Sequence, residues 1–278
     1  MTQQPNRRVR HRRSLTRRRA VVGGVAALGL TGALVITNSL QSEAEAAPSW
    51  PTPSGQKPVA KTIEVKAGQT HDGELKRYYG TGDLGDGGQG EGQDPIIKLQ
   101  DGATLKNVVL GSPAADGVHC MGSCTLQNVW WEDVGEDAAS FKGKSSGATY
   151  TVTGGGARKA DDKVFQFNGA GRLTITRFQV ADFGKLVRSC GNCSKQYKRD
   201  IVVDDVDVTA PGNSIAGINT NYGDTATLRK VRVHGDSNRK IKTCTRFTGN
   251  SSGDEPVETG NGPDGRYCKF TASDISYS

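Results

Sequence analysis

Histidine, methionine and aromatic residues are scarce in this chain of 278 residues. It has four His, two Met and 6% Phe, Trp and Tyr, against 37 Gly, and its mean hydropathy is −0.54. Long apolar stripes are missing, and glycine is costly inside helices, so the composition argues against a large helical bundle. A β protein rich in turns fits better. The scarcity of His also argues against a zinc centre.

The basic excess is confined to one end of the chain. The formal net charge is +7, from 36 Lys+Arg and 29 Asp+Glu, but residues 1–46 alone contain eight Arg and two Glu. The remaining residues therefore have 28 basic and 27 acidic side chains, a net charge of +1. This nearly neutral body argues against a protein that binds nucleic acid.

Residues 1–46 have the pattern of an export signal peptide. The eight arginines precede a chargeless stretch, residues 20–42, and the small-residue sequence 44–47 follows at once. These are the basic, apolar and cleavage-site parts of an export signal. A membrane anchor is the alternative, since about 20 apolar residues span a bilayer, but four glycines interrupt the stretch. We expect cleavage near Ala46 by either the general or the twin-arginine route, then secretion to the extracellular space without stable membrane association.

All six cysteines follow the predicted cleavage site. Export leads to an oxidising compartment, where disulfides are favoured over a zinc or redox Cys-x-x-Cys site. The simplest of the fifteen possible connectivities joins neighbours along the chain. It pairs Cys120 with Cys124, Cys190 with Cys193 and Cys244 with Cys268.

A short apolar motif repeats along the chain after a proline-rich opening segment, residues 47–60. In each copy an apolar residue is followed three positions later by another, and first members lie 21 to 28 residues apart. Asn107 and Asn128 occupy the same place in consecutive copies, as stacked turn side chains would. The copies are Leu105/Val108, Leu126/Val129, Ile175/Phe178, Val203/Val206 and Leu228/Val231, with Val152 marking a divergent one.

This repeat favours an all-β, single-domain parallel β-helix over residues 61–278. A period in the twenties with short strands and no helix suits coils that bury their inward side chains only against their neighbours. A leucine-rich repeat has a similar period but a stricter leucine pattern. A β-sandwich is the main alternative, although its strands need no such register.

A column of charged residues crosses the predicted coils. Asp116, Asp137 and Lys163 each lie 11 residues after the first apolar residue of their copy, and Lys185 lies 10 after. With strands about 4.8 Å apart, the column passes from carboxylates to cations over roughly 15 Å. Three further charged residues flank it: Asp133, Glu136 and Arg188.

The two halves of the column predict two kinds of ligand. Hard carboxylate oxygens suit Ca²⁺ better than a soft transition metal. Clustered cations beside them would bind an anionic substrate, with Ca²⁺ bridging it to the acidic half. An acidic polysaccharide is the natural candidate for an exported β-helix. The candidate calcium ligands are Asp116, Glu136, Asp137, Asp133 and Glu91, and the candidate substrate-binding cations are Lys159, Lys163, Lys185 and Arg188.

Such a site suits abstraction of a proton from the carbon next to a uronate carboxylate. Negative charge then develops on the carboxylate oxygens, where a metal and cations stabilise it. A lysine acts as the base only when neutral, and we expect neighbouring cations and Ca²⁺ to depress its pKa. Activity should therefore rise with pH.

Four stretches resemble, in order, the signature stretches of the family 3 pectate lyases. They span residues 114–120, 128–138, 160–166 and 183–188, and the resemblance as a whole covers about residues 60 to 235. It implies a right-handed parallel β-helix that cleaves polygalacturonate by calcium-dependent β-elimination. The sequence departs from the family pattern in the Gly-rich loop 80–92 and in the segment after residue 238.

The resemblance also implies roles for individual residues. Lys163 matches the base, while Lys185 and Arg188 would hold and neutralise the substrate carboxylate. Asp162, next to Lys163, could orient that lysine. The calcium-binding carboxylates match Asp116, Glu136 and Asp137, and a loop acid matches Glu91.

Two other functions remain open at this point. A polygalacturonase-type hydrolase would use Asp116 with Asp137 as acid and base, which leaves the four cations without a chemical task. A non-catalytic, calcium-dependent binding protein would use the same groove without forming product. Whichever function holds, we expect a monomer.

Overall fold

A computed structural model of the chain describes residues 49–278 except residues 86 and 91. Among these residues the helices are three 3-10 turns, η1 (Gly82–Leu84), η2 (Thr220–Tyr222) and η3 (Ala272–Asp274). The predicted export signal, residues 1–46, lies outside the described residues. The strands are β1 (Gln56–Val59), β2 (Ile63–Val65), β3 (Thr70–Gly80), β4 (Ile97–Leu99), β5 (Ala103–Leu110), β6 (Val118–Cys120), β7 (Cys124–Trp131), β8 (Asp137–Phe141), β9 (Thr149–Phe167), β10 (Gly171–Ser189), β11 (Arg199–Asn219), β12 (Thr225–His234), β13 (Lys242–Thr248), β14 (Val257–Asn261), β15 (Cys268–Lys269) and β16 (Ile275–Tyr277).

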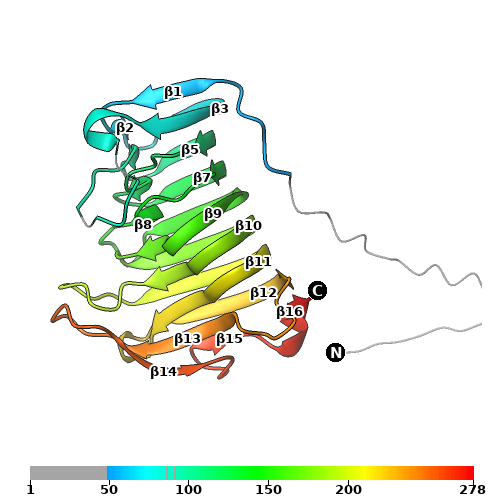
Figure 1. Cartoon of the computed structure of the whole chain (residues 1–278). Helices are drawn as coiled ribbons and strands as arrows, with labels where there is room; N and C mark the ends of the chain where they lie inside the picture. The colour runs from blue at the N-terminus through cyan, green and yellow to red at the C-terminus, as the bar shows by residue number, and fades with distance from the viewer. Residues whose placement is uncertain (1–48, 86, 91) are drawn as a thin grey trace, which may run out of the picture. The chain divides into compact units, whose positions relative to one another are not determined.

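These strands stack as the coils of a parallel β-helix (Figure 1). One row of hydrogen-bonded strands runs from β1 through β3, β5, β7, β9, β10 and β11 to β12, and a second row, β2-β4-β6-β8, joins it at β9. Among the described residues, the ladder between β13 and β14 and one bridge, Pro95 to Ala115, are antiparallel. The predicted fold is confirmed, but β1 shows that the sheet begins inside the segment 47–60.

The apolar repeats have the register that their spacing predicts. Leu105 pairs with Leu126, Leu126 with Val152, and the column continues through Ile175 and Val203 to Leu228. All six side chains are fully buried. Each coil therefore removes its inward residues from water by packing on the next coil, which is the main stabilising contribution of the stack.

Two positions after each of these buried residues, within the strand, the backbone is left-handed. Asn107 and Asn128 have φ of 53° and 55°, and the Nδ2 of Asn128 donates a hydrogen bond of 2.9 Å to the Oδ1 of Asn107. Asparagine tolerates this conformation better than most residues with a side chain. The predicted stacking of the two asparagines is confirmed.

Aromatic rings fill the interior between the coils that contain the charged column. Trp131 is fully buried and meets Phe165 and Phe178 edge-on, with ring centroids 6.0 and 6.4 Å away. Its neighbour Trp130 points to the opposite side of the strand and is covered by Trp50, with ring centroids 5.1 Å apart. The tryptophan pair therefore contributes to packing on both sides of β7.

The three predicted disulfides are present, joining Cys120 to Cys124, Cys190 to Cys193 and Cys244 to Cys268.

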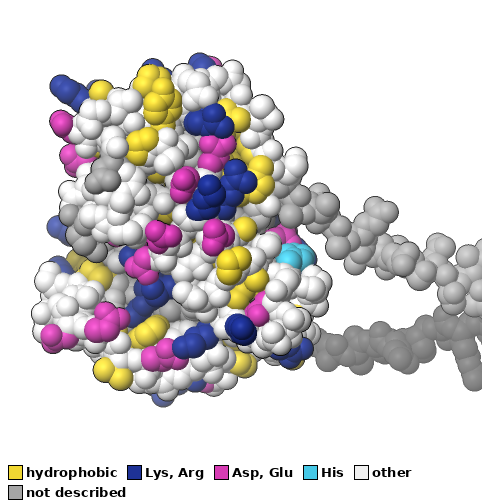
Figure 2. All heavy atoms as spheres, viewed as in Figure 1, with side chains coloured by type: hydrophobic (Ala, Val, Ile, Leu, Met, Phe, Trp, Pro, Cys, Tyr) yellow, Lys and Arg dark blue, Asp and Glu magenta, His cyan; other side chains and the backbone are white. Residues whose placement is uncertain are grey.

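No helix among the described residues is long and apolar enough to cross a membrane. On the face in Figure 2, acidic and basic side chains are interspersed.

Candidate active site

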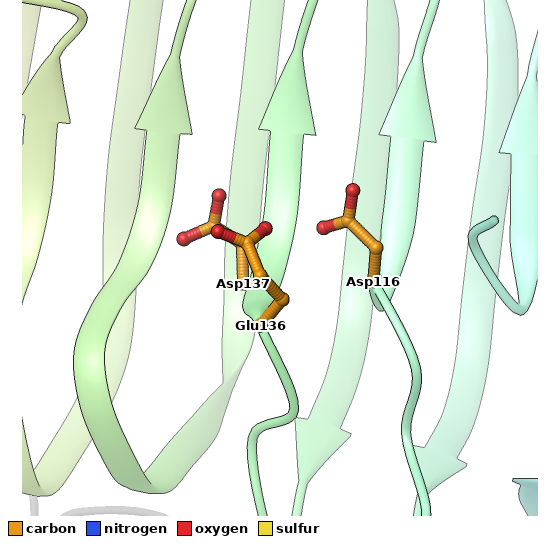
Figure 3. A group of neighbouring side chains, drawn as sticks. All are labelled: Asp116, Glu136 and Asp137. Atoms are coloured by element: carbon orange, nitrogen blue, oxygen red, sulfur yellow. The ribbon is translucent and has the colours of Figure 1, made fainter. Parts of the chain in front are cut away.

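Three carboxylates meet where two successive coils enter the second row of strands. Asp116 precedes β6, and Glu136 and Asp137 stand at the start of β8. Each offers an oxygen within 4.8 Å of the others, and the three carboxylates lie side by side on two successive coils (Figure 3). Glycine allows the backbones to approach here, because a Cβ at Gly135 would lie 2.1 Å from the carbonyl oxygen of Ala115.

Burial makes this acidic group unfavourable when all its members are charged. The exposed fractions of Asp116, Glu136 and Asp137 are 6%, 8% and 2%. Burial, then repulsion from Asp137 and Asp116, raises the pKa of Glu136 to about 9. Burial also raises the pKa of Asp137 to about 7, with Lys163 opposing the shift.

The donor set fits a calcium ion. The Oδ1 atoms of Asp116 and Asp137 are buried without a hydrogen-bond partner, and that of Asp137 has an ion-pair contact of 3.5 Å with the Nζ of Lys163. Such oxygens are costly to leave unpaired, and a hard divalent cation would satisfy them. All the ligand atoms of the group are carboxylate oxygens, which again favours Ca²⁺ over a transition metal.

Two predicted calcium ligands are not found in this group. Asp133 is half-buried in the turn between β7 and β8 and is not one of the three grouped carboxylates. Its role as a calcium ligand therefore stays a prediction. Glu91 lies outside the described residues.

Two further residues contact the acidic group. The Nε2 of His119 lies 2.5 Å from the Oδ2 of Asp116. The Nζ of Lys142 lies 3.0 Å from the same imidazole nitrogen and 3.8 Å from the Asp116 Oδ2. Lys142 follows β8 directly. It does not lie at the offset that the charged column shares, so the repeat does not predict its place in the site.

The basic half continues the column in register. Lys163 on β9 pairs with Asp137 on β8 and with Lys185 on β10. The Nζ of Lys163 lies 2.6 Å from Asp162, 3.5 Å from Asp137 and 3.8 Å from Glu136. The other oxygen of Asp162 accepts a hydrogen bond from Lys185, so one carboxylate bridges the two lysines.

The electrostatics of Lys163 differ from the expectation that cations would depress its pKa. Burial alone lowers the pKa, but Asp137, Asp162 and Glu136 together outweigh burial and raise it above its ordinary value. The expectation was wrong for the protein without a bound cation, because three carboxylates lie within 4 Å of the amine.

Arg188 lines the same cavity as these lysines and is 7% exposed. Its Nη1 donates to the backbone oxygen of Ser189 and, at 3.0 Å, to the Oδ1 of Asn219, and its guanidinium lies 4.0 Å from the ring centre of Phe247. A Cβ at Gly217 would lie 2.7 Å from the Arg188 side chain, so glycine makes room for it. Burial lowers the pKa of Arg188 to about 10.

Lys163, Lys185 and Arg188 all line one cavity of about 250 Å³. Its lining includes Asp162, Lys163, Gln166, Lys185, Arg188 and Phe247. Lys159 is not in this lining. It is exposed and has a left-handed backbone, with φ of 58°, and its role as a substrate-binding cation stays a prediction. Phe247 and Asn219 were not anticipated, because neither falls on the charged column.

A parallel β-helix with a buried carboxylate group beside a cationic cavity is suited to an enzyme that acts on an acidic polysaccharide. The chain belongs to the pectate lyase family, whose family model matches residues 47–254. It is therefore a polysaccharide lyase, and its resemblance to the family 3 pectate lyases is confirmed.

Relatives and solved structures agree with this membership. The chain is 47% identical over 225 residues to the "Probable pectate lyase E" of Neosartorya fischeri, covering 80% of this chain and 85% of the relative. It is 44% identical to the "Pectate lyase E" of Emericella nidulans, covering 85% and 89%. The catalytic domain of pectate lyase PelI from Erwinia chrysanthemi superposes with a TM-score of 0.69 at 34% identity, covering 80% of this chain and 100% of that domain.

Proposed function

We propose that the protein is a secreted enzyme that cleaves polygalacturonate by calcium-dependent β-elimination. The main support is that Asp137, Lys163 and Lys185 pair on three neighbouring strands. This pairing places the acidic group next to the cationic cavity. PelI, one of the structural neighbours, has also been solved in complex with tetragalacturonic acid, at 33% identity and a TM-score of 0.68, covering 80% of this chain and 70% of that one. This supports a galacturonate chain as the ligand.

Asp116, Glu136 and Asp137 would hold the calcium ion. When bound there, Ca²⁺ stabilises the negative charge that develops on the substrate carboxylate as the proton leaves. Asp162 binds both Lys163 and Lys185 and fixes the separation of their amines.

The basic residues would bind the substrate carboxylate and take the proton. Lys185 and Arg188 bind the uronate carboxylate. Lys163, in its neutral form, takes the proton from the adjacent ring carbon. The electrons of that carbon–hydrogen bond form a carbon–carbon double bond as the glycosidic carbon–oxygen bond breaks, and the leaving oxygen gains a proton. Pairing of Glu136 and Asp137 with a cation would reduce the attraction that keeps the proton on Lys163.

A hydrolase is the less favourable interpretation of the same residues. An acid and base pair made of Asp116 and Asp137 would leave the cations that line the cavity, Lys163, Lys185 and Arg188, without a chemical task. Measuring reducing ends and ultraviolet absorbance in one polygalacturonate digest separates the candidates. Elimination gives both signals, hydrolysis gives reducing ends alone, and a binding protein gives neither.

Calcium affinity should increase as the pH is raised from about 6 to 9. In the cation-free protein Asp137 and Glu136 retain protons in this range, with pKa values of about 7 and 9, and the ion must displace them. Calorimetric titrations at several pH values, in buffers of different ionisation enthalpy, measure both the affinity and the released protons. Asp137→Asn should weaken binding more strongly than Asp133→Asn. A calcium affinity that does not change with pH would contradict the assignment of Asp137 and Glu136 as calcium ligands.

A further inference from the structure

A second cavity of about 390 Å³ adjoins the first on the C-terminal side. Lys185, Arg188 and Phe247 line both cavities, so the two are adjacent along the stack. The remaining lining comes mainly from β11, β13 and β14. Its polar members include Ser214, Lys240, Lys242 and Glu258.

The charged column extends into this second cavity. Lys185 pairs with Ser214 on β11, and Ser214 pairs with Lys242 on β13. Lys242 therefore stands two strands beyond Lys185, about 10 Å along the stack at ordinary strand spacing. That distance leaves room for a bound polymer to continue from the first cavity into the second.

The charge of the second cavity suits an anionic ligand. Four cations, Lys185, Arg188, Lys240 and Lys242, line it together with a single carboxylate, Glu258. The Nζ of Lys242 donates to both oxygens of Glu258, at 2.7 and 2.8 Å. The two side chains are 45% and 41% exposed, so exchanging this pair for another carboxylate costs little.

We propose that this second cavity is an additional subsite for the polysaccharide, in which Lys242 binds the carboxylate of a uronate unit away from the reacting bond. Glu258 occupies Lys242 in the free protein and competes with the substrate for it. The inference rests on the proposed function for its ligand class. Glu258 belongs to β14, which lies beyond the residues that the family model matches.

Binding of two oligomers of different length tests the subsite. The full-length chain with Lys163→Ala, which should suppress turnover while Ca²⁺ stays bound, is titrated in saturating Ca²⁺ with digalacturonate and with hexagalacturonate. Digalacturonate is too short to reach from Lys163 to Lys242, whereas hexagalacturonate spans both. Adding Lys242→Ala should lower hexamer affinity about fivefold, as expected for an exposed ion pair, and change dimer affinity less than twofold. Glu258→Gln should raise hexamer affinity, because it frees Lys242.

Lys66→Ala, at an exposed lysine near the first coil, controls for the loss of one surface charge. Unchanged hexamer affinity in Lys242→Ala would overturn the subsite. An equal loss with both oligomers, or the same loss in Lys66→Ala, would overturn it as well. A separate assay of the unmodified chain for unsaturated product decides the proposed function, so the two failures are distinguishable.

Discussion

Replacement of Lys163 by alanine should lower kcat by roughly 10²- to 10⁴-fold, the usual contribution of a positioned general base. Lys163 is the cation that touches all three carboxylates Asp137, Glu136 and Asp162, and it lines the cavity where substrate would bind. In the unmodified protein kcat should rise with pH, because only the neutral amine accepts a proton and its pKa is raised in the absence of a cation. Initial rates of unsaturated product, measured across pH, check both statements.

The variant Lys163→Arg separates a base from a fixed positive charge. Arginine keeps the charge but does not release its proton in ordinary proteins. If Lys163 is the base, Lys163→Arg should be as inactive as Lys163→Ala, with a similar melting temperature to the unmodified chain. Substantial activity in Lys163→Arg would show that the residue acts through its charge and would remove it as the base.

Substitution of Arg188 by lysine should lower kcat by about 10²- to 10³-fold, as when a fixed donor to a developing charge is lost. The guanidinium is positioned by Asn219 and Phe247. A lysine offers a mobile point charge without the planar fork of donors that matches a carboxylate. Steady-state rates on polygalacturonate of defined length measure the loss. Retention of at least half of the kcat in Arg188→Lys would exclude a specific role for the guanidinium.

Arg199 provides the matched control for a buried arginine. It is fully buried and donates to the backbone oxygens of Gly169 and Asn168, at 2.9 and 2.8 Å, but it does not line the 250 Å³ cavity. Arg199→Lys should therefore reduce the free energy of unfolding by about 1 to 3 kcal/mol through unsatisfied carbonyl groups. The kcat of the protein that remains folded should not change.

The coil architecture could be predicted from the sequence because its physical cause is periodic. Every coil needs an inward apolar residue at the same place, so Leu105 and Leu126 already define the register that continues to Leu228. The charged column follows from the same register, since Asp137, Lys163 and Lys185 share one offset to within a residue. The asparagine pair was predictable for the same reason.

Residues that depend on departures from the period could not be predicted. Lys242 joins the column because β13 pairs with β11, and the loop between β12 and β13 shifts it away from the regular offset. Phe247 reaches the cavity from the same strand. Lys159 shows the opposite case, because it falls near the column in sequence but is exposed and does not line the cavity.

The pKa of Lys163 depends on distances that spacing alone does not give. The sequence places cations and carboxylates within one or two strands of the lysine, and either could dominate. The structure brings three carboxylates within 4 Å of its amine. Ionic interactions fall with distance, so the acidic neighbours decide the direction of the shift.

Ultraviolet absorbance of a polygalacturonate digest, followed with Ca²⁺, then with a chelator and then with Ca²⁺ restored, tests whether the protein carries out calcium-dependent elimination. We expect absorbance from an unsaturated uronide that stops increasing on chelation and resumes when Ca²⁺ is returned. The group Asp116, Glu136 and Asp137 should be responsible for this dependence. Absorbance that continues to rise at the same rate in excess chelator would contradict calcium-dependent elimination. Reducing ends that appear without any new absorbance would contradict it as well.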